Sequence, residues 1–155
     1  MLVPLAISYI SNDGSRATPA GDGSSWPLTP CMNVLFGFGP TPRWEHVTGM
    51  IDTGASPVLA APELVRRHGC PQIKGPTLIH GPNQSMSLGE FEVLIGIADP
   101  ARREMHGIVI PAVAFDLSGS GCQLVLGRRF LRHVQMFVNG PASEITAAFD
   151  TDSLN

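Results

Sequence analysis

The sequence predicts an all-β fold with one or two short helices. Glycine and proline are both frequent, with 17 and 14 residues, and favour turns and short strands over long helices. Hydrophobic residues make up 43% of the chain and charged residues 15%, a composition typical of a globular domain. Apolar residues recur at every second position from Phe91 to Ile97, which is the period of a half-buried strand. We therefore expect one domain over residues 1–155.

The first half of the chain is expected to hold three strands and one helix. Residues 3–10 are apolar and predict the first strand, with a signal peptide as the alternative interpretation. Residues 11–30 are rich in Gly, Ser, Asp and Pro and predict a long flexible loop or arm. A short helix is predicted over 62–69, because it starts with proline and ends with glycine. Two further apolar runs predict strands, over residues 31–38 and 44–51.

The second half is expected to be β-rich, with one more short helix. Extended runs at 73–80 and 85–97 flank Gly-Pro-Asn-Gln, a combination that signals a hairpin. Asp99-Pro100 marks a turn, and Pro111 is expected to interrupt the next β-rich run. The remaining predictions are a β-rich run at 105–115, a flexible loop at 116–122, a buried strand at 123–127, a helix at 128–134 and a closing hairpin formed by 135–139 and 144–149.

Charge and composition exclude several classes of function. The net charge of -3 offers no positive surface for nucleic acid, so no nucleic-acid partner is expected. No apolar run is long enough to span a membrane. His68 and Cys70 are close in sequence, but no second pair matches them, so we expect no metal site.

The cysteines indicate a compartment. Three of them, Cys31, Cys70 and Cys122, are widely spaced and odd in number, which argues against a disulfide framework. A reducing, cytoplasmic environment fits this pattern best. The sequence also leaves open that the chain is a domain of a larger or membrane-linked protein.

One motif carries chemistry. In Ile-Asp-Thr-Gly-Ala-Ser, Asp52 directly follows an apolar run and is followed by small residues. Asp-Thr-Gly alone is also good turn chemistry. A second signature sharpens the interpretation: Leu-Val-Leu-Gly-Arg, residues 124–128, where buried apolar residues lead into glycine and a short helix.

Together these motifs resemble those of the retropepsin-like aspartic proteases, the single-domain relatives of the pepsins. The resemblance covers about residues 31–149 and implies an acid-protease barrel with a flap hairpin near residues 81–84. It implies that Asp52, Thr53 and Gly54 form the catalytic loop. It also implies substrate contacts from Ala55, Ile79, His80 and Gly81, with Val58 and Leu59 as further candidates for which core packing is the alternative. Structural support would come from Val125, Leu126, Gly127 and Arg128.

The resemblance also implies a mechanism and an assembly. Two carboxylates share one proton and activate a water against a peptide bond, without a metal or other cofactor. Because Asp-Thr-Gly occurs once, each chain of a homodimer would supply one Asp52. By analogy with viral relatives, the strands near residues 3–10 and 144–149 are the expected dimer elements. The substrate would be a peptide or protein.

Two positions depart from the family pattern. Viral relatives carry an acidic residue two positions after the catalytic glycine, paired with the arginine that corresponds to Arg128. Here Ser56 occupies that position, so Arg128 is expected to find another partner or to face solvent. Ala55 lacks the hydroxyl that pepsins carry, which predicts activity nearer neutral pH.

Two other interpretations remain. The chain could be a retropepsin-like module that is catalytically silent and serves in dimerisation or peptide binding. It could also be a plain β-barrel in which Asp-Thr-Gly is only a turn, an interpretation that the signature at 124–128 argues against. Loss of activity in Asp52→Asn with the dimer preserved separates the protease from the silent module.

Overall fold

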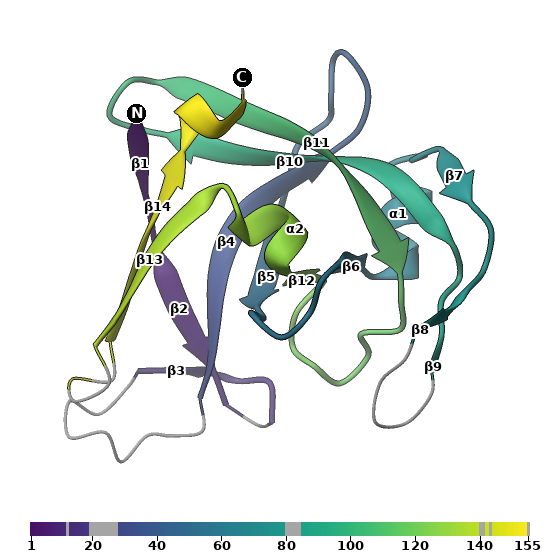
Figure 1. Ribbon diagram of the computed structural model, residues 1–155, viewed down its shortest axis with the longest axis horizontal. Coiled ribbons are helices and arrows are strands. Elements are labelled where there is room, and N and C mark those ends of the chain that lie inside the picture. Colours follow the sequence, from purple (N-terminus) through teal and green to yellow (C-terminus); the bar gives the residue numbers. More distant parts are fainter. Residues whose placement is uncertain (12, 19–27, 80–84, 140–141, 143, 155) are drawn as a thin grey trace.

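The computed structural model describes residues 1–11, 13–18, 28–79, 85–139, 142 and 144–154, and these residues are mostly β-structure. Six strands close into a barrel (Figure 1). In the order in which they pair, these are β4 (Thr29–Gly37), β5 (Glu45–Ile51), β12 (Leu124–Leu126), β6 (Val58–Ala60), β11 (Glu104–Ala114) and β10 (Glu90–Asp99). The barrel closes where β10 pairs antiparallel with β4, with Ile95 opposite Phe36. The predicted predominance of β-structure is confirmed.

The barrel encloses the main apolar core. On β10 the predicted period of two is present, because Val93, Ile95 and Ile97 are buried in the core while Ala98 is exposed. The predicted interruption at Pro111 is wrong. Pro111 lies within β11 opposite Glu92, and the strand continues through it to Ala114.

A three-stranded sheet stands beside the barrel and joins the two ends of the chain. It has the order β1 (Leu2–Leu5), β14 (Glu144–Asp150), β13 (Val134–Asn139), and its last two strands form the predicted closing hairpin. The predicted single strand over 3–10 is wrong. The chain leaves this sheet at Ala6, and β2 (Ile7–Ile10) pairs instead with β4. Pro4 is tolerated because β1 is an edge strand of the three-stranded sheet.

The predicted arm over 11–30 is partly structured. Arg16 and Ala17 form strand β3 (Arg16–Ala17), which pairs with β2, and Thr29 already belongs to β4. Residues 19–27 lie outside the described residues. The expectation of one long loop is therefore wrong at both ends.

Two short helices occur where the sequence predicts them. Helix α1 (Pro62–Arg67) has proline in its first turn, and Gly69 beyond its end adopts φ +62°, a conformation that glycine allows. Helix α2 (Arg128–Leu131) follows β12 through Gly127. A 3₁₀ turn, η1 (Thr151–Leu154), is an addition that the sequence did not indicate.

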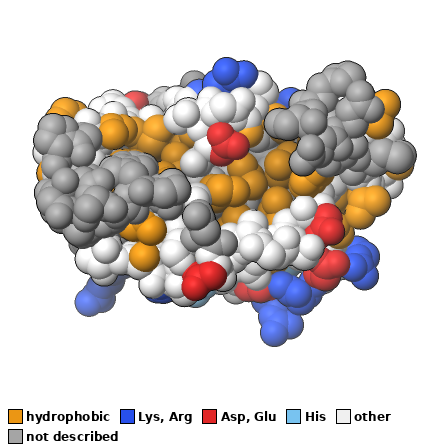
Figure 2. Space-filling view, turned by 90° about the horizontal axis from the view of Figure 1, so that it is seen from below, with side chains coloured by type: hydrophobic (Ala, Val, Ile, Leu, Met, Phe, Trp, Pro, Cys, Tyr) orange, Lys and Arg blue, Asp and Glu red, His pale blue; other side chains and the backbone are white. Residues whose placement is uncertain are grey.

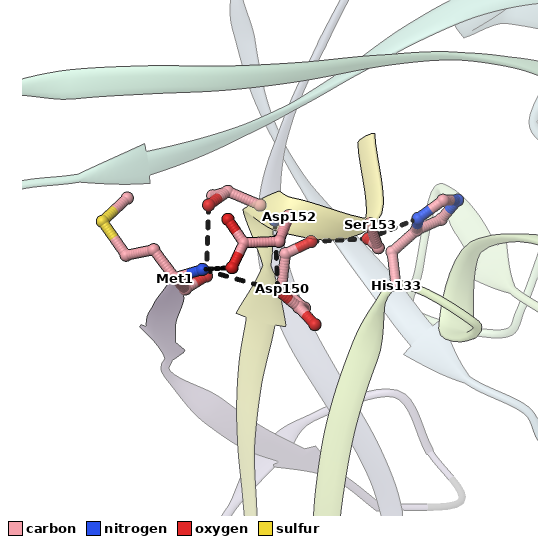
Figure 3. A network of polar contacts seen from close by, with 6 residues as sticks. Met1, His133, Asp150, Asp152 and Ser153 are labelled. Atoms are coloured by element: carbon pink, nitrogen blue, oxygen red, sulfur yellow. Dashed lines mark hydrogen bonds and ion pairs between the residues drawn. The ribbon is translucent and has the colours of Figure 1, made fainter. Parts of the chain in front are cut away.

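Polar contacts hold η1 against the end of α2 (Figure 3). The ring Nδ1 of His133 lies 2.7 Å from Ser153 Oγ, and Arg132 Nε donates to His133 Nε2 at 3.0 Å. Burial, followed by the charge of Arg132, lowers the pKa of His133, so the imidazole is held neutral at neutral pH. The Met1 amino group pairs with Asp150 and Asp152 on the other side of the same turn.

Candidate active site

Asp52 sits on a tight loop directly after β5. Its backbone N–H donates to Leu126 O at 3.3 Å, so the loop begins hydrogen-bonded to β12. Its carboxylate oxygen Oδ1 accepts hydrogen bonds from Gly54 N at 2.8 Å and Ala55 N at 3.2 Å. Within the described part of the chain, Oδ2 has no hydrogen-bond partner. The half-buried carboxylate is therefore held by one oxygen and presents the other.

Strand β12 supports this loop from behind. It lies between β5, with which it is parallel, and β6, with which it is antiparallel, so Val125 pairs with both Met50 and Leu59. The loop of residues 52–57 thus connects two strands that are separated by β12. A strand is present over residues 124–126, where the sequence predicts a buried strand, and it lies between the two strands that the Asp52 loop connects.

Gly127 allows the loop and helix α2 to meet. A Cβ atom on Gly127 would lie 2.1 Å from Pro57 O and 2.8 Å from Ala55 O, so no side chain fits. Immediately after it, Arg128 N donates to Ala55 O at 2.8 Å and Arg129 N donates to Ser56 O at 3.0 Å. The first N–H groups of α2 are thereby satisfied by the loop that carries Asp52.

Arg128 also holds the loop with its side chain. Of the two outcomes expected from Ser56, another partner or solvent, Arg128 finds a partner. The guanidinium Nη2 donates to the Ser56 hydroxyl. A hydroxyl therefore accepts the contact for which the family pattern has a carboxylate. The link is neutral on one side and lies at the exposed edge of the loop.

The arms of a hairpin are present where the sequence predicts the flap. Strands β8 (Leu78–Ile79) and β9 (Ser85–Met86) pair antiparallel, with Ile79 opposite Ser85. The predicted contacts His80 and Gly81 lie outside the described residues, as does the rest of the tip. The extended runs predicted here are shorter than expected, because β7 (Gln72–Lys74) and β10 are separate strands on either side of the hairpin.

The base of this hairpin holds a polar pair that the sequence did not reveal, formed by an exposed threonine and a buried serine. The Ser87 side chain is 1% exposed, and its Oγ lies 3.0 Å from both the backbone N and the Oγ1 of Thr77. Ser87 N donates to Thr77 O at 2.8 Å. Neither residue stands out in the sequence, because Ser and Thr are common in loops; only the fold pairs them.

Thr53 and Val58 have contrasting environments. Thr53 is exposed beside Asp52, with its side chain on the surface of the loop. Val58 is fully buried in the core, so its candidacy as a wall of the substrate site is wrong. Leu59 is half-buried.

The comparisons with known proteins add no assignment: no family model and no curated protein sequence matches this chain. Across the described ranges, no three His, Cys, Asp or Glu side chains gather in a group that could hold a metal ion. Nor does any helix in those ranges have the length and apolar character needed to cross a membrane.

Proposed function

We propose that this protein is an aspartic endopeptidase of the retropepsin-like type, active as a homodimer in which each chain supplies one Asp52. The observation that carries the proposal is the carboxylate itself. Asp52 is oriented by two backbone N–H groups on Oδ1, and among the described residues its Oδ2 has no hydrogen-bond partner and its carboxylate pairs with no cation. A carboxylate fixed in this way is suited to share a proton with a second one.

The reaction follows from such a pair. The ionised carboxylate takes a proton from a water, whose oxygen forms a bond to the carbonyl carbon of the substrate. The other carboxylate gives its proton to the carbonyl oxygen, which yields a neutral tetrahedral diol. Transfer of a proton to the nitrogen then breaks the C–N bond and releases the two peptides. Thr53, which is exposed beside Asp52, would hydrogen-bond across the pair of loops through its hydroxyl.

Three features support a second copy as the partner. The chain has a single Asp-Thr-Gly, so one protomer is half of a site. The three-stranded sheet ends in β1 and β13, and on β13 Phe137 and Val138 are 66% and 58% exposed. Hydrophobic side chains also gather across the middle of the face seen from below in Figure 1, with an acidic side chain beside them (Figure 2).

The test is cleavage of an unfolded protein substrate between about pH 3.5 and pH 7.5, the range in which a carboxylate pair titrates. Wild type and Asp52→Asn are assayed together, and the mass of each is measured by light scattering. We expect the variant to lose activity by about 10³-fold or more while it remains dimeric. Asn keeps an oxygen for Gly54 and Ala55 but cannot act as the acid or the base.

The second candidate is the catalytically silent dimerisation or peptide-binding module. It is favoured if both proteins are dimeric and neither cleaves any substrate in the panel. Equal cleavage by wild type and Asp52→Asn would reject the aspartic mechanism outright. A monomeric wild type would reject the homodimer.

A further inference from the structure

A cavity lies at the opposite end of β5 from Asp52. Its volume is about 450 Å³, within the usual range of small-ligand sites. With about 3.3 Å of rise per residue, the seven steps from Glu45 to Asp52 separate it from the candidate active site by roughly 23 Å. The cavity is lined by Phe38, Arg43, Trp44, Glu45, Arg67 and His68.

The aromatic wall of this cavity is built into the barrel. A Cβ on Gly96 of β10 would lie 2.8 Å from the Trp44 ring atom Cζ3, and one on Gly37 of β4 would lie 3.2 Å from Cε3. Gly107 of β11 lies opposite Gly96, and its Cβ would lie 3.9 Å from Cη2. Three adjacent strands thus present bare backbone to one edge of the indole. The ring is held in place while the half-buried side chain still borders the cavity.

The carboxylate in the cavity is already neutralised. Glu45 accepts hydrogen bonds from Arg67 Nη2 at 2.6 Å and Nε at 3.0 Å, and its Oε2 lies 3.0 Å from His68 Nε2. These contacts, first that with Arg67, lower the pKa of Glu45 and keep it ionised at neutral pH. His68 is itself fixed edge-on against Phe36, with ring centroids 5.1 Å apart.

Arg43 is the uncompensated charge. Within the described residues its guanidinium has neither an ion pair nor a hydrogen bond, and the side chain is exposed at the cavity. Arg67 donates two of its five N–H groups to Glu45, which leaves three that make no bond to this carboxylate. The cavity therefore combines one net positive charge with an aromatic wall.

We propose that this cavity binds a carboxylate carried on a flat apolar group. The carboxylate would meet the guanidinium fork of Arg43, and the apolar part would lie against Trp44. A free aromatic acid and an acidic residue next to an aromatic one in a peptide share this chemistry. The site is independent of Asp52 and of the proposed protease activity.

The test uses the fluorescence of Trp44. The chain has two tryptophans, so Trp26→Phe makes Trp44 the sole reporter. The probes are benzoate, the blocked dipeptide acetyl-Glu-Phe-amide and inorganic phosphate. We expect benzoate, the dipeptide or both to change the emission saturably, and phosphate to bind at least about 10-fold more weakly because it lacks an apolar part.

Two arginine variants decide the assignment. Arg43→Gln should weaken binding by about 10-fold or more, the usual cost of a hydrogen bond to a charged group. Arg66→Gln is the matched control, because Arg66 is on α1 and pairs with Glu63, outside the cavity lining. Urea unfolding of each variant verifies its fold.

Each outcome bears on the proposal. Binding of benzoate alone identifies a free acid as the ligand, and binding of the dipeptide identifies an acidic peptide; both support the site. The proposal is overturned if neither probe binds, if phosphate binds as tightly as the better probe, or if Arg43→Gln leaves binding intact.

Discussion

Strand β5 has a carboxylate at each end, and the two are held in opposite ways. Glu45, at its start, is bound by the side chains of Arg67 and His68, and its pKa is lowered. Asp52, just after its end, accepts hydrogen bonds from backbone N–H groups on one oxygen, and in the described part of the chain its other oxygen has no partner. A carboxylate paired with cations stays ionised and contributes to structure. One that is positioned by backbone N–H groups on a single oxygen leaves its other oxygen open to a second group.

The largest effect is expected from disrupting the close contact between Gly127 and the Asp52 loop. Gly127→Ala places a Cβ against the backbone carbonyls of Pro57 and Ala55, neither of which is at the end of a flexible chain. We expect a loss of about 3 kcal/mol or more in the free energy of unfolding, measured in urea, together with loss of cleavage. Gly75→Ala is the matched control, since nothing lies within 4 Å of its added Cβ. Equal stability of the two variants would show that the loop yields easily.

Removing each of the two carboxylates in turn should affect stability at one end of β5 and activity at the other. Glu45→Gln should cost about 0.5–1 kcal/mol of stability at pH 7, because the ion pair with Arg67 is partly exposed. Asp52→Asn should change stability by less than about 0.5 kcal/mol, while it removes activity. The comparison fails if Asp52→Asn is the more destabilising of the two.

The cost of Glu45→Gln should depend on pH. The lowered pKa of Glu45 means that its contribution is present above the ordinary value of 4.5 and is lost as pH falls through the folded value. The difference in unfolding free energy between wild type and Glu45→Gln should therefore shrink toward acid. A constant difference would show that shape, rather than charge, matters at Glu45.

The same contrast explains what could be predicted from the sequence. The Asp52 loop, Gly127 and α2 were predictable because a short motif with small residues sets their local geometry. The cavity at Trp44 was not, since Gly37 lies far in sequence from the β10–β11 hairpin that holds Gly96 and Gly107, and the three meet only in the barrel. The switch of sheets at Ala6 and the three-residue strand β6 were missed for the same reason. Their pairing partners decide them, and local propensity does not.

A smaller effect is expected from adding a hydrogen-bond donor at the candidate active site. Ala55→Ser places a hydroxyl beside the carboxylate that Ala55 N already contacts. A further hydrogen bond to the charged form should shift the pH profile of cleavage toward acid, on the order of half a pH unit. Ala98→Ser, exposed on β10, is the control and should leave the profile in place. A shift toward neutral pH would contradict the role assigned to the missing hydroxyl.

The smallest effect is expected from adding to the Asp52 loop a carboxylate that is paired with an arginine, as Glu45 is. Ser56→Asp replaces the hydroxyl that accepts from Arg128 with a carboxylate, which creates an exposed ion pair. We expect a gain of about 0.2–1 kcal/mol in urea unfolding that falls with added salt.

The Arg128→Gln background decides whether that pair forms, because the gain should vanish there in a double-mutant cycle. The same background tests whether pairing with a cation decides how a carboxylate near Asp52 affects the pH profile. If Arg128 neutralises the new carboxylate, the pH profile of cleavage should stay unchanged in Ser56→Asp alone. In the double variant the unpaired charge, four residues from Asp52, should move the profile toward neutral pH, since a nearby negative charge disfavours ionisation of the pair. A shift already present in the single variant would mean that Arg128 supports the loop through Ser56 as a hydrogen-bond donor only, and that it does not neutralise a charge at the Asp52 end of β5.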